Sequence, residues 1–520
     1  MLLTQPLRRM NQIAATRIAT IDGSEQRTWA ETHDRIAKLA RGLADLGVKE
    51  GDRVAILALN SFRYMETYFG ILWRGAVVVP LNTRWSVEEL GYGLSDSASD
   101  VLFIDANFLP HLPTLRERWP NLKHVVFIGE NPPPGLLAYE SLISDKAALP
   151  PADLPPTALA VICYTGGTTG LAKGVMQSHL AIWASSVALS IDYDTLTSER
   201  TAFLHAMPLF HAGGSAVLFA TTIAGGTHVF LPSFDAQAVL ASIQRYRITH
   251  TQMVPTMVRM LLDRPDFGSY DVSSLRTLVY GAAPMTTTQI EETLAKLPHV
   301  RLQQGYGQTE LAPYISSLRP ADHVTVGDRA QRLRSAGYAG LCSEIMIADK
   351  DGNELPRGEV GEVLVRGPHM MSGYWHKPEE TRATIVNGWI RTGDAGYMDD
   401  GGFIFLVDRM KDMIVSGGEN IYSSEVENVV ARHPAVAANA IIGIPSEKWG
   451  EAVHAIVILR PGHSAAAEDI IGHCKTFIAG YKCPRSVEFR TEPLPVSGVG
   501  KILKRELRKP YWEGRASKLA

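Results

Sequence analysis

The sequence has few cysteines, no long apolar run and no excess of charge of one sign. Four cysteines occur among 520 residues. They lie far apart without a C-x-x-C spacing, which favours reduced structural thiols over a disulfide framework or a metal site. No apolar run approaches the roughly 20 residues that a membrane helix needs. The formal net charge of -3 at pH 7 argues against a nucleic-acid binder that depends on bulk positive charge.

The two ends of the sequence show no clear targeting signal. The first 20 residues contain arginines and no apolar segment, so no signal peptide is expected. The tripeptide Ser-Lys-Leu would be a peroxisomal signal only at the very end, and Ala520 follows it. We therefore expect a cytoplasmic protein.

Hydrophobic periodicity predicts an α/β protein of at least two domains. Helical spacing at 28–48 and 60–75 alternates with apolar strands at 53–59 and 76–82, which is typical of a doubly wound parallel sheet. From about Ser335, short strands separated by Gly-containing turns indicate a small β-barrel-like subdomain. After Arg409, helix and strand patterns of a compact α+β module follow. The predicted domains are residues 1–409 and 410–520.

The stretch "YTGGTTGLAKGV" at 164–175 follows an apolar strand and combines glycines, threonines and a lysine. It is not a Walker P-loop, because Ala172 and Gly174 stand where that motif needs Gly and Ser or Thr. Glycines still allow backbone N–H groups to approach an anion, and we expect the next helix to add the positive end of its dipole. A phosphate-binding loop is therefore predicted, with a flexible surface loop as the alternative.

Six further motifs follow in order: MPLFH at 207–211, YGAAP at 280–284, QGYGQTE at 304–310, WIRTGD at 389–394, DRMKDMIVSGGENIYSSEVE at 408–427 and PVSGVGKILKREL at 495–507. With them the chain resembles the adenylate-forming superfamily of acyl-CoA synthetases, luciferases and adenylation domains over residues 28–507. The resemblance implies a large N-terminal domain of two doubly wound α/β subdomains plus the β-barrel-like subdomain. It also implies a small mobile C-terminal lid.

The resemblance implies binding of ATP and Mg²⁺ and assigns residues to them. The phosphates would be bound by Thr165, Gly166, Gly167, Thr168, Thr169, Gly170 and Lys173, and the adenine by Ala282, Ala283, Pro284, Gln304, Gly305, Tyr306 and Gly307. Asp394 would accept hydrogen bonds from both ribose hydroxyls, and Arg409 would be a second ribose or phosphate contact. Glu310 and Thr169 would hold the Mg²⁺. Each motif also has a plainer interpretation, for example a turn at "TGD" or a helix cap at Thr309–Glu310.

The chemistry implied is activation of a carboxylic acid. Attack of the acid on the α-phosphate of ATP gives an acyl-adenylate and pyrophosphate. By resemblance, Lys501 neutralises the charge that develops there. A cation about 4 Å from an oxyanion contributes roughly 4 kcal/mol at an effective dielectric constant of 20. Thr309 would donate to the α-phosphate, and His211 is either a gate of the acid pocket or a packed side chain.

A second step is implied by the C-terminal motifs. The lid would rotate about a hinge at Lys411, and the segment Ser416, Gly417, Gly418, Glu419 and Asn420 would then line a thiol tunnel. Free coenzyme A is the simplest thiol acceptor, since no carrier domain follows. A plain surface loop is the alternative for this segment.

The segments assigned to the acid pocket by resemblance are 210–217, 253–257, 280–283 and 305–308, with 311–314 nearby. They contain no aspartate for an amino-acid ammonium group and no arginine for a second carboxylate. The sequence therefore predicts an ATP-dependent acid–CoA ligase of fatty acid metabolism or a related route. Its substrate would be a medium- or long-chain fatty acid, or an aryl or alicyclic acid. The alternatives are an acyl-AMP ligase that loads a carrier protein, a luciferase-like enzyme, a phosphotransferase and a nucleotide-binding sensor. The oligomeric state is open, with a homodimer as one alternative.

Overall fold

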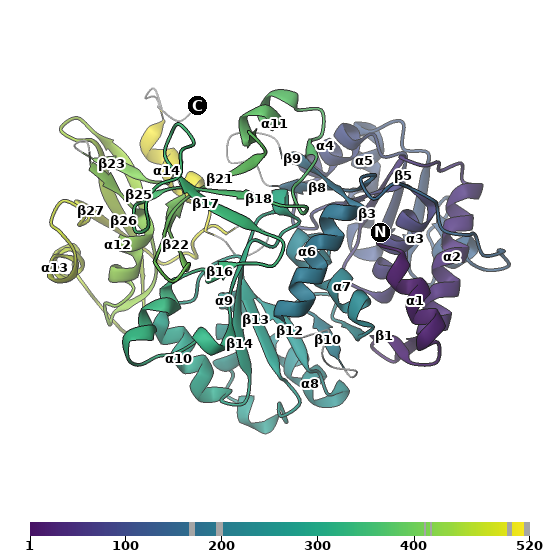
Figure 1. The fold of residues 1–520 in the computed structure, drawn as a ribbon, viewed down its shortest axis with the longest axis horizontal. Coiled ribbons are helices and arrows are strands. Elements are labelled where there is room, and N and C mark those ends of the chain that lie inside the picture. Colours follow the sequence, from purple (N-terminus) through teal and green to yellow (C-terminus); the bar gives the residue numbers. More distant parts are fainter. Residues whose placement is uncertain (166–171, 194–200, 410–411, 417–418, 497–501, 514–520) are drawn as a thin grey trace. The chain divides into compact units, whose positions relative to one another are not determined.

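The computed structural model describes residues 1–165, 172–193, 201–409, 412–416, 419–496 and 502–513, with the backbone alone at 408, 409 and 420. The chain divides into two compact units. Unit 1 consists of residues 1–344 and 365–390, and unit 2 of residues 345–364 and 391–520. Each unit is described by itself, and Figure 1 labels most of their helices and many of their strands.

The first sheet of unit 1 has eight strands in the order β19-β9-β8-β4-β3-β5-β6-β7. Their bounds are β3 (Arg53–Leu57), β4 (Val77–Pro80), β5 (Val101–Asp105), β6 (His124–Ile128), β7 (Leu137–Ala138), β8 (Leu159–Thr165), β9 (Lys173–Ser178) and β19 (Gly373–Tyr374). The strands from β8 to β7 run parallel, whereas β9 pairs antiparallel with β8 and β19 pairs antiparallel with β9. The continuous apolar runs of the central strands fit a sheet that is covered on both faces.

Helices α1 (Gln5–Ile13), α2 (Trp29–Asp45), α3 (Phe62–Arg74), α4 (Val87–Ser97) and α5 (Leu112–Arg118) lie in the same part of the chain. Local signals fix their ends. Thr28 caps α2 in a reciprocal pair with Glu31, and Ser61 caps α3 through its side chain. Helix α3 ends at Gly75, whose φ of 80° is the left-handed conformation that glycine adopts readily.

The second sheet of unit 1 has nine strands in the order β16-β15-β14-β13-β12-β10-β11-β1-β2. They are β1 (Ile18–Asp22), β2 (Glu25–Thr28), β10 (Ala202–His205), β11 (Thr227–Phe230), β12 (His250–Met253), β13 (Thr277–Gly281), β14 (Arg301–Tyr306), β15 (Ser316–Leu318) and β16 (Tyr338–Ala339). The intervening helices are α6 (His179–Asp192), α7 (Ala212–Ala224), α8 (Ala236–Tyr246), α9 (Pro255–Leu262) and α10 (Thr287–Lys296), and α11 (Pro378–Thr384) follows later. The parallel core from β11 to β14 is the predicted α/β alternation.

Strands β17 (Glu344–Ala348), β18 (Gly361–Arg366), β20 (Ile385–Val386), β21 (Trp389–Met398) and β22 (Ile404–Arg409) form a five-stranded sheet. The last part of unit 2 has the strand order β24-β23-β26-β25, with β27 paired to β26. Its elements are β23 (Ile414–Ser416), β24 (Glu419–Ile421), β25 (Val436–Ser446), β26 (Gly450–Leu459), β27 (Ser486–Arg490), α12 (Ser423–Val430), α13 (Ala467–Phe477) and α14 (Lys504–Trp512). Lys504 anchors α14, because its Nζ lies 2.7 Å from Glu427 Oε1.

The predicted fold class is confirmed: a large α/β part is followed by a small α+β part. One local prediction is wrong. The segment after the glycine-rich loop is strand β9, which returns antiparallel along β8, so a helix dipole does not follow the loop directly. The predicted domain boundary at residues 409 and 410 stays a prediction. Within the described residues, each helix is too short or too polar to traverse a lipid bilayer.

Candidate active site

Two adjacent parallel strands of the second sheet, β13 and β14, end at predicted adenine-binding motifs. Gly281 is paired with Gly305 in register, so Ala282, directly after β13, and Tyr306, the last residue of β14, lie at neighbouring strand ends. Ligands of open α/β sheets bind outside such carboxyl ends. Ala282 has a φ of 64°, a left-handed conformation that costs a residue with a Cβ about 1–2 kcal/mol. Strained residues of this kind are typical of functional loops.

Close packing explains the glycines at these strand ends. A Cβ on Gly281 would lie 2.7 Å from the carbonyl oxygen of Gly305, and one on Gly307 would lie 1.5 Å from that of Pro313. Both positions therefore exclude any other residue without backbone movement. The structure thus brings together the described residues Ala282, Ala283, Pro284, Gln304, Gly305, Tyr306 and Gly307 at one sheet edge.

Glu310, the predicted Mg²⁺ ligand, is oriented by a tyrosine that sequence reasoning missed. The hydroxyl of Tyr374, in β19, donates to Glu310 Oε1 at 2.8 Å. Burial, and then the negative charge of Glu310, raise the pKa of Tyr374 above its ordinary value. The tyrosine is therefore a neutral donor at every physiological pH.

Lys173 belongs to the same cluster. Its Nζ lies 4.9 Å from the ring centroid of Tyr374, a cation–π distance. Tyr374 therefore contacts the predicted phosphate-binding lysine with its ring and the predicted metal-binding carboxylate with its hydroxyl. Thr165 stands opposite Lys173 in the β8–β9 pair.

Hydrogen bonds to the carbonyls of Thr309 and Glu310 fix this cluster, which we name the Lys173–Tyr374–Glu310 cluster. The side chain of Gln177 in β9 donates to the carbonyl of Thr309 at 2.7 Å, and the N–H of Met371 donates to the carbonyl of Glu310 at 2.8 Å. Three segments distant in sequence thus meet around Thr309 and Glu310.

The MPLFH motif reaches the cluster through Cys163 of β8. The Cys163 thiol contacts the carbonyl of Phe210 at 3.9 Å. Burial, and then the negative charge of Glu310, raise the pKa of that thiol to about 12, so it is protonated at neutral pH. His211 follows Phe210 at the start of α7 without capping it. Burial, and then the charge of Arg84, lower the pKa of His211 to about 4, so the imidazole is neutral at pH 7.

A buried asparagine holds the loop before His211. The Asn60 amide donates to the carbonyls of His205 and Met207 at 3.3 and 2.9 Å, and its Oδ1 accepts from the N–H of Leu209 at 2.9 Å. Asn60 follows β3 of the first sheet, and His205 ends β10 of the second. One side chain therefore links both sheets at the motif that carries His211.

In unit 2, Asp394 is buried in β21 and stands opposite Arg409 of β22 in the antiparallel register. The segment "TGD" is therefore strand and not a turn. Ser416 ends β23 and pairs with Glu419 of β24, so the described ends of the predicted thiol-tunnel segment belong to two antiparallel strands. The predicted ribose contacts of Asp394 and Arg409 and the predicted thiol tunnel stay predictions.

Several predicted site residues lie outside the described residues: Gly166, Gly167, Thr168, Thr169, Gly170, Lys411, Gly417, Gly418 and Lys501, together with the side chains of Arg409 and Asn420. Their assignments stay predictions from the sequence.

The residues near Glu310 fit a Mg²⁺ ion shared with phosphate oxygens. Within the described ranges no group of three or more His, Cys, Asp or Glu side chains could hold a metal by itself. Mg²⁺ needs only one or two carboxylates when phosphates and water supply the rest. The Tyr374 hydroxyl donates to Oε1 of Glu310, and Oε2 would be the oxygen that binds the ion. Carboxylates that bind metals are commonly oriented by a hydrogen bond of this kind.

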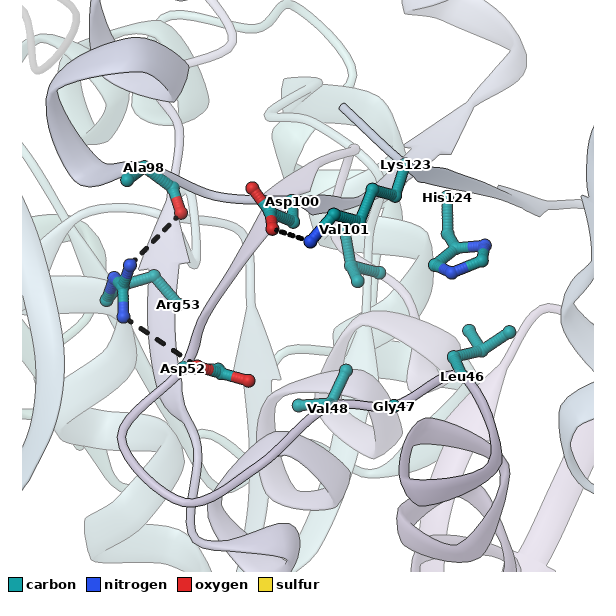
Figure 2. Close-up of a pocket in the computed structure, with 10 residues that line it drawn as sticks. All are labelled: Leu46, Gly47, Val48, Asp52, Arg53, Ala98, Asp100, Val101, Lys123 and His124. Atoms are coloured by element: carbon teal, nitrogen blue, oxygen red, sulfur yellow. Dashed lines mark hydrogen bonds and ion pairs between the residues drawn. The ribbon is translucent and has the colours of Figure 1, made fainter. Parts of the chain in front are cut away.

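A separate pocket lies where β3, β5 and β6 begin, at the opposite ends of the strands from the candidate site. Figure 2 shows its lining: Leu46, Gly47, Val48, Asp52, Arg53, Ala98, Asp100, Val101, Lys123 and His124. Lys123 Nζ pairs with Asp100 Oδ2 at 2.6 Å, and Arg53 Nη2 donates to the carbonyl of Ala98 at 3.3 Å. None of these residues belongs to the predicted site, and the charged groups neutralise one another.

Comparison with known proteins finds similar chains over nearly the whole length. The family model described as AMP-binding enzyme matches residues 7–375, and that of the AMP-binding enzyme C-terminal domain matches residues 425–501. A feruloyl-CoA synthase of Amycolatopsis sp is 39% identical over 493 residues, which cover 94% of this chain and 95% of the relative. The fatty acid–[acyl-carrier-protein] ligase ScoC of Streptomyces coeruleorubidus is 37% identical over 496 residues, covering 95% and 93%. The crystal structure of the anthranilate CoA ligase AuaEII in complex with anthranoyl-AMP matches with a TM-score of 0.90 at 30% identity, covering 98% of this chain and 97% of that one.

Proposed function

Since the chain belongs to the AMP-binding enzyme family, we propose that it is an AMP-forming acid–CoA ligase. It would activate a hydrophobic monocarboxylic acid with ATP and transfer the acyl group to coenzyme A. The observation that carries this proposal is the Lys173–Tyr374–Glu310 cluster. A phosphate-directed lysine and a carboxylate suited to a divalent cation are fixed there by one neutral tyrosine.

The first step forms a bond between a carboxylate oxygen of the acid and the α-phosphorus of ATP. The bond from that phosphorus to the bridging oxygen of the β-phosphate breaks, and pyrophosphate leaves with the electron pair. Lys173 is proposed to bind phosphate oxygens, and Thr309 to donate to the α-phosphate. Bound at Glu310, Mg²⁺ would neutralise negative charge on the phosphates. Lys501 is proposed to stabilise the transferring oxygens, as the resemblance implies.

The second step moves the acyl group to sulfur. The thiolate of coenzyme A attacks the acyl carbon, and AMP leaves with the oxygen that joined it to that carbon. The proposed agents are the segment 416–420 and a domain alternation about Lys411. This part of the proposal rests on the sequence motifs.

The acid is proposed to be hydrophobic with a single carboxylate. The curated relatives named above are a feruloyl-CoA synthase and a fatty acid–[acyl-carrier-protein] ligase. By their names, one relative acts on an aromatic acid and the other on an aliphatic acid. The apolar segments 210–217 and 311–314 support an uncharged acyl group.

A carrier-protein acceptor is the second candidate, since ScoC is a ligase of that kind at 37% identity. The first half-reaction is common to both candidates. They differ only in whether a thioester with free coenzyme A is made.

The test follows AMP and pyrophosphate from purified protein with ATP, Mg²⁺ and a panel of aromatic and aliphatic acids, with and without coenzyme A. We expect AMP with at least one acid and a CoA thioester as product. Glu310→Gln should reduce adenylate formation strongly, whereas the exposed control Glu291→Gln should not. Release of ADP, or no nucleotide cleavage with any acid, would refute the ligase proposal. Adenylate without thioester would favour the carrier-protein candidate.

A further inference from the structure

Tyr193 lies against two of the four segments assigned to the acid pocket and against Tyr314 of the nearby segment 311–314, although sequence reasoning did not identify it. It follows the last turn of α6 and is 4% exposed. In one apolar cluster it packs with Ala216 and Val217, and its ring lies edge-on to that of Tyr314, with centroids 6.3 Å apart. Its hydroxyl lies 2.6 Å from the point where a Cβ on Gly305 would stand.

The Tyr193 hydroxyl is a neutral group with unused hydrogen-bonding capacity. Burial, and then the negative charge of Asp192, raise the pKa of Tyr193 above its ordinary value, so the phenol stays protonated. Within the described part of the chain this hydroxyl takes part in none of the observed hydrogen bonds. A buried phenol normally has a partner, and a ligand group at the end of β14 would supply it.

An ion pair between Asp192 and Arg319 lies beside Tyr193. Asp192 has a side chain that is 2% exposed, with Arg319 Nη2 at 2.8 Å from Oδ1, and the Tyr314 hydroxyl donates to Oδ2. The Arg319 guanidinium also stacks 4.7 Å from the Tyr338 ring centroid. The Arg319 side chain is 38% exposed. A long alkyl chain that reached this ion pair would cover ionic groups with methylenes, which is unfavourable. Since Asp192 offsets the charge of Arg319, the pair offers little to a second substrate carboxylate.

We propose that Tyr193 determines the substrate class of this enzyme, and that its preferred acid is aromatic with a ring hydroxyl that hydrogen-bonds to the Tyr193 hydroxyl. The aromatic body of such an acid packs edge-to-face on the rings of Tyr193 and Tyr314. The ring hydroxyl of the acid hydrogen-bonds to the Tyr193 hydroxyl, and the acid is short enough not to reach the Asp192–Arg319 pair. The inference rests on the proposed acid–CoA ligase function.

The experiment measures kcat/KM for AMP formation with two matched pairs, 4-hydroxycinnamate with cinnamate and 4-hydroxybenzoate with benzoate, and with dodecanoate. Two ring-to-carboxylate lengths are included because the depth of the hydroxyl differs between them. We expect at least one pair to show about a tenfold preference for the hydroxylated acid, the value of one buried hydrogen bond. In Tyr193→Phe the ratio should fall toward one, mostly through KM, because the bond forms equally in ground and transition states.

Tyr246→Phe is the control, since the Tyr246 hydroxyl donates to the carbonyl of Gly23 at 2.7 Å, away from the site. It should keep the wild-type ratio. A ratio unchanged by Tyr193→Phe, no hydroxyl preference in either pair, or better use of dodecanoate than of the aromatic acids would overturn the inference while AMP formation upheld the ligase proposal. Absence of AMP with every acid would refute both. The wild-type ratios decide the question even if Tyr193→Phe fails to fold.

Discussion

Asn60 is a residue whose replacement tests how the active-site loop is held. Its amide bridges the carbonyls of His205 and Met207 and the N–H of Leu209, and it is 4% exposed. Asn60→Ala removes all three hydrogen bonds at once. Because these bonds connect the end of β3 to the loop before His211, the change should affect both the stability of unit 1 and catalysis.

The magnitude follows from the groups left behind. The N–H of Leu209 would lose its acceptor in a buried position, which costs about 1–3 kcal/mol. Of the two carbonyls, that of His205 keeps the N–H of Leu231 as a donor at 3.3 Å, whereas that of Met207 loses the amide at a cost of about 1 kcal/mol. We therefore expect the free energy of unfolding to fall by about 2–4 kcal/mol. A displacement of about 1 Å at the site can reduce a rate about 100-fold, so kcat/KM should fall at least tenfold.

The assay pairs denaturant unfolding with AMP formation well below the unfolding transition, so that loss of folded protein and loss of positioning are separated. Asn60→Asp should be at least as damaging at pH 7, because a carboxylate can still accept from Leu209 but faces two carbonyl oxygens without a donor. The exposed Asn121→Ala is the control. Wild-type stability and wild-type kcat/KM in Asn60→Ala would refute the reasoning.

Three further predictions concern charge. Burial lowers the pKa of His205 to about 3 and that of its partner His228 well below the ordinary 6.5. The unfolded chain therefore binds more protons below pH 6.5, and His205 alone should lower the free energy of unfolding by about 2 kcal/mol between pH 7 and pH 5; equal stability in urea at both pH values would contradict this. Tyr374→Phe should raise the KM for ATP with Mg²⁺ about tenfold, because Glu310 loses a charge-assisted hydrogen bond; an unchanged magnesium dependence would count against the orienting role. Lys501→Ala should reduce adenylation about 1,000-fold, from roughly 4 kcal/mol of charge stabilisation, yet largely spare thioester formation from supplied acyl-adenylate; equal losses in both steps would refute the assignment.

Local signals made much of the fold predictable. The helix at 28–48 was expected from its periodicity. Helix α2 begins at Trp29, directly after its N-cap Thr28, because Thr28 and Glu31 accept hydrogen bonds from each other's N–H groups. Strand β4 is apolar, and so is β3 after Arg53, so their burial was expected as well. Strand β9 was missed. Its sequence "KGVMQS" mixes polar and apolar residues, and its pairing with β8 spans a loop whose length no periodicity reveals.

In the site, too, features that depend on neighbouring residues could be predicted from the sequence, whereas contacts between distant segments could not. Glycines at 281, 305 and 307 are visible because each lies in a short motif, although the structure shows why they are needed: backbone lies close to Gly281 and Gly307, and the Tyr193 hydroxyl lies close to Gly305. The partners of Glu310 are not visible, since Tyr374 lies 64 residues away and its role depends on β19 pairing with β9. The residues next to Tyr374 in the sequence give no sign that its hydroxyl contacts Glu310.

Asn60 and Tyr193 show why such residues escape motif-based reasoning. Asn60 is 149 residues from Leu209, and Tyr193 is separated from Gly305 by several strands and helices. A sequence motif consists of residues close together in the chain that contact one ligand. The contacts of Asn60 and Tyr193 form only after the two sheets have packed, when Asn60 holds a loop and Tyr193 completes the wall of the proposed pocket. If both variants behave as predicted, substrate choice and loop placement in this enzyme are properties of its tertiary packing, and the motifs alone supply the common chemistry.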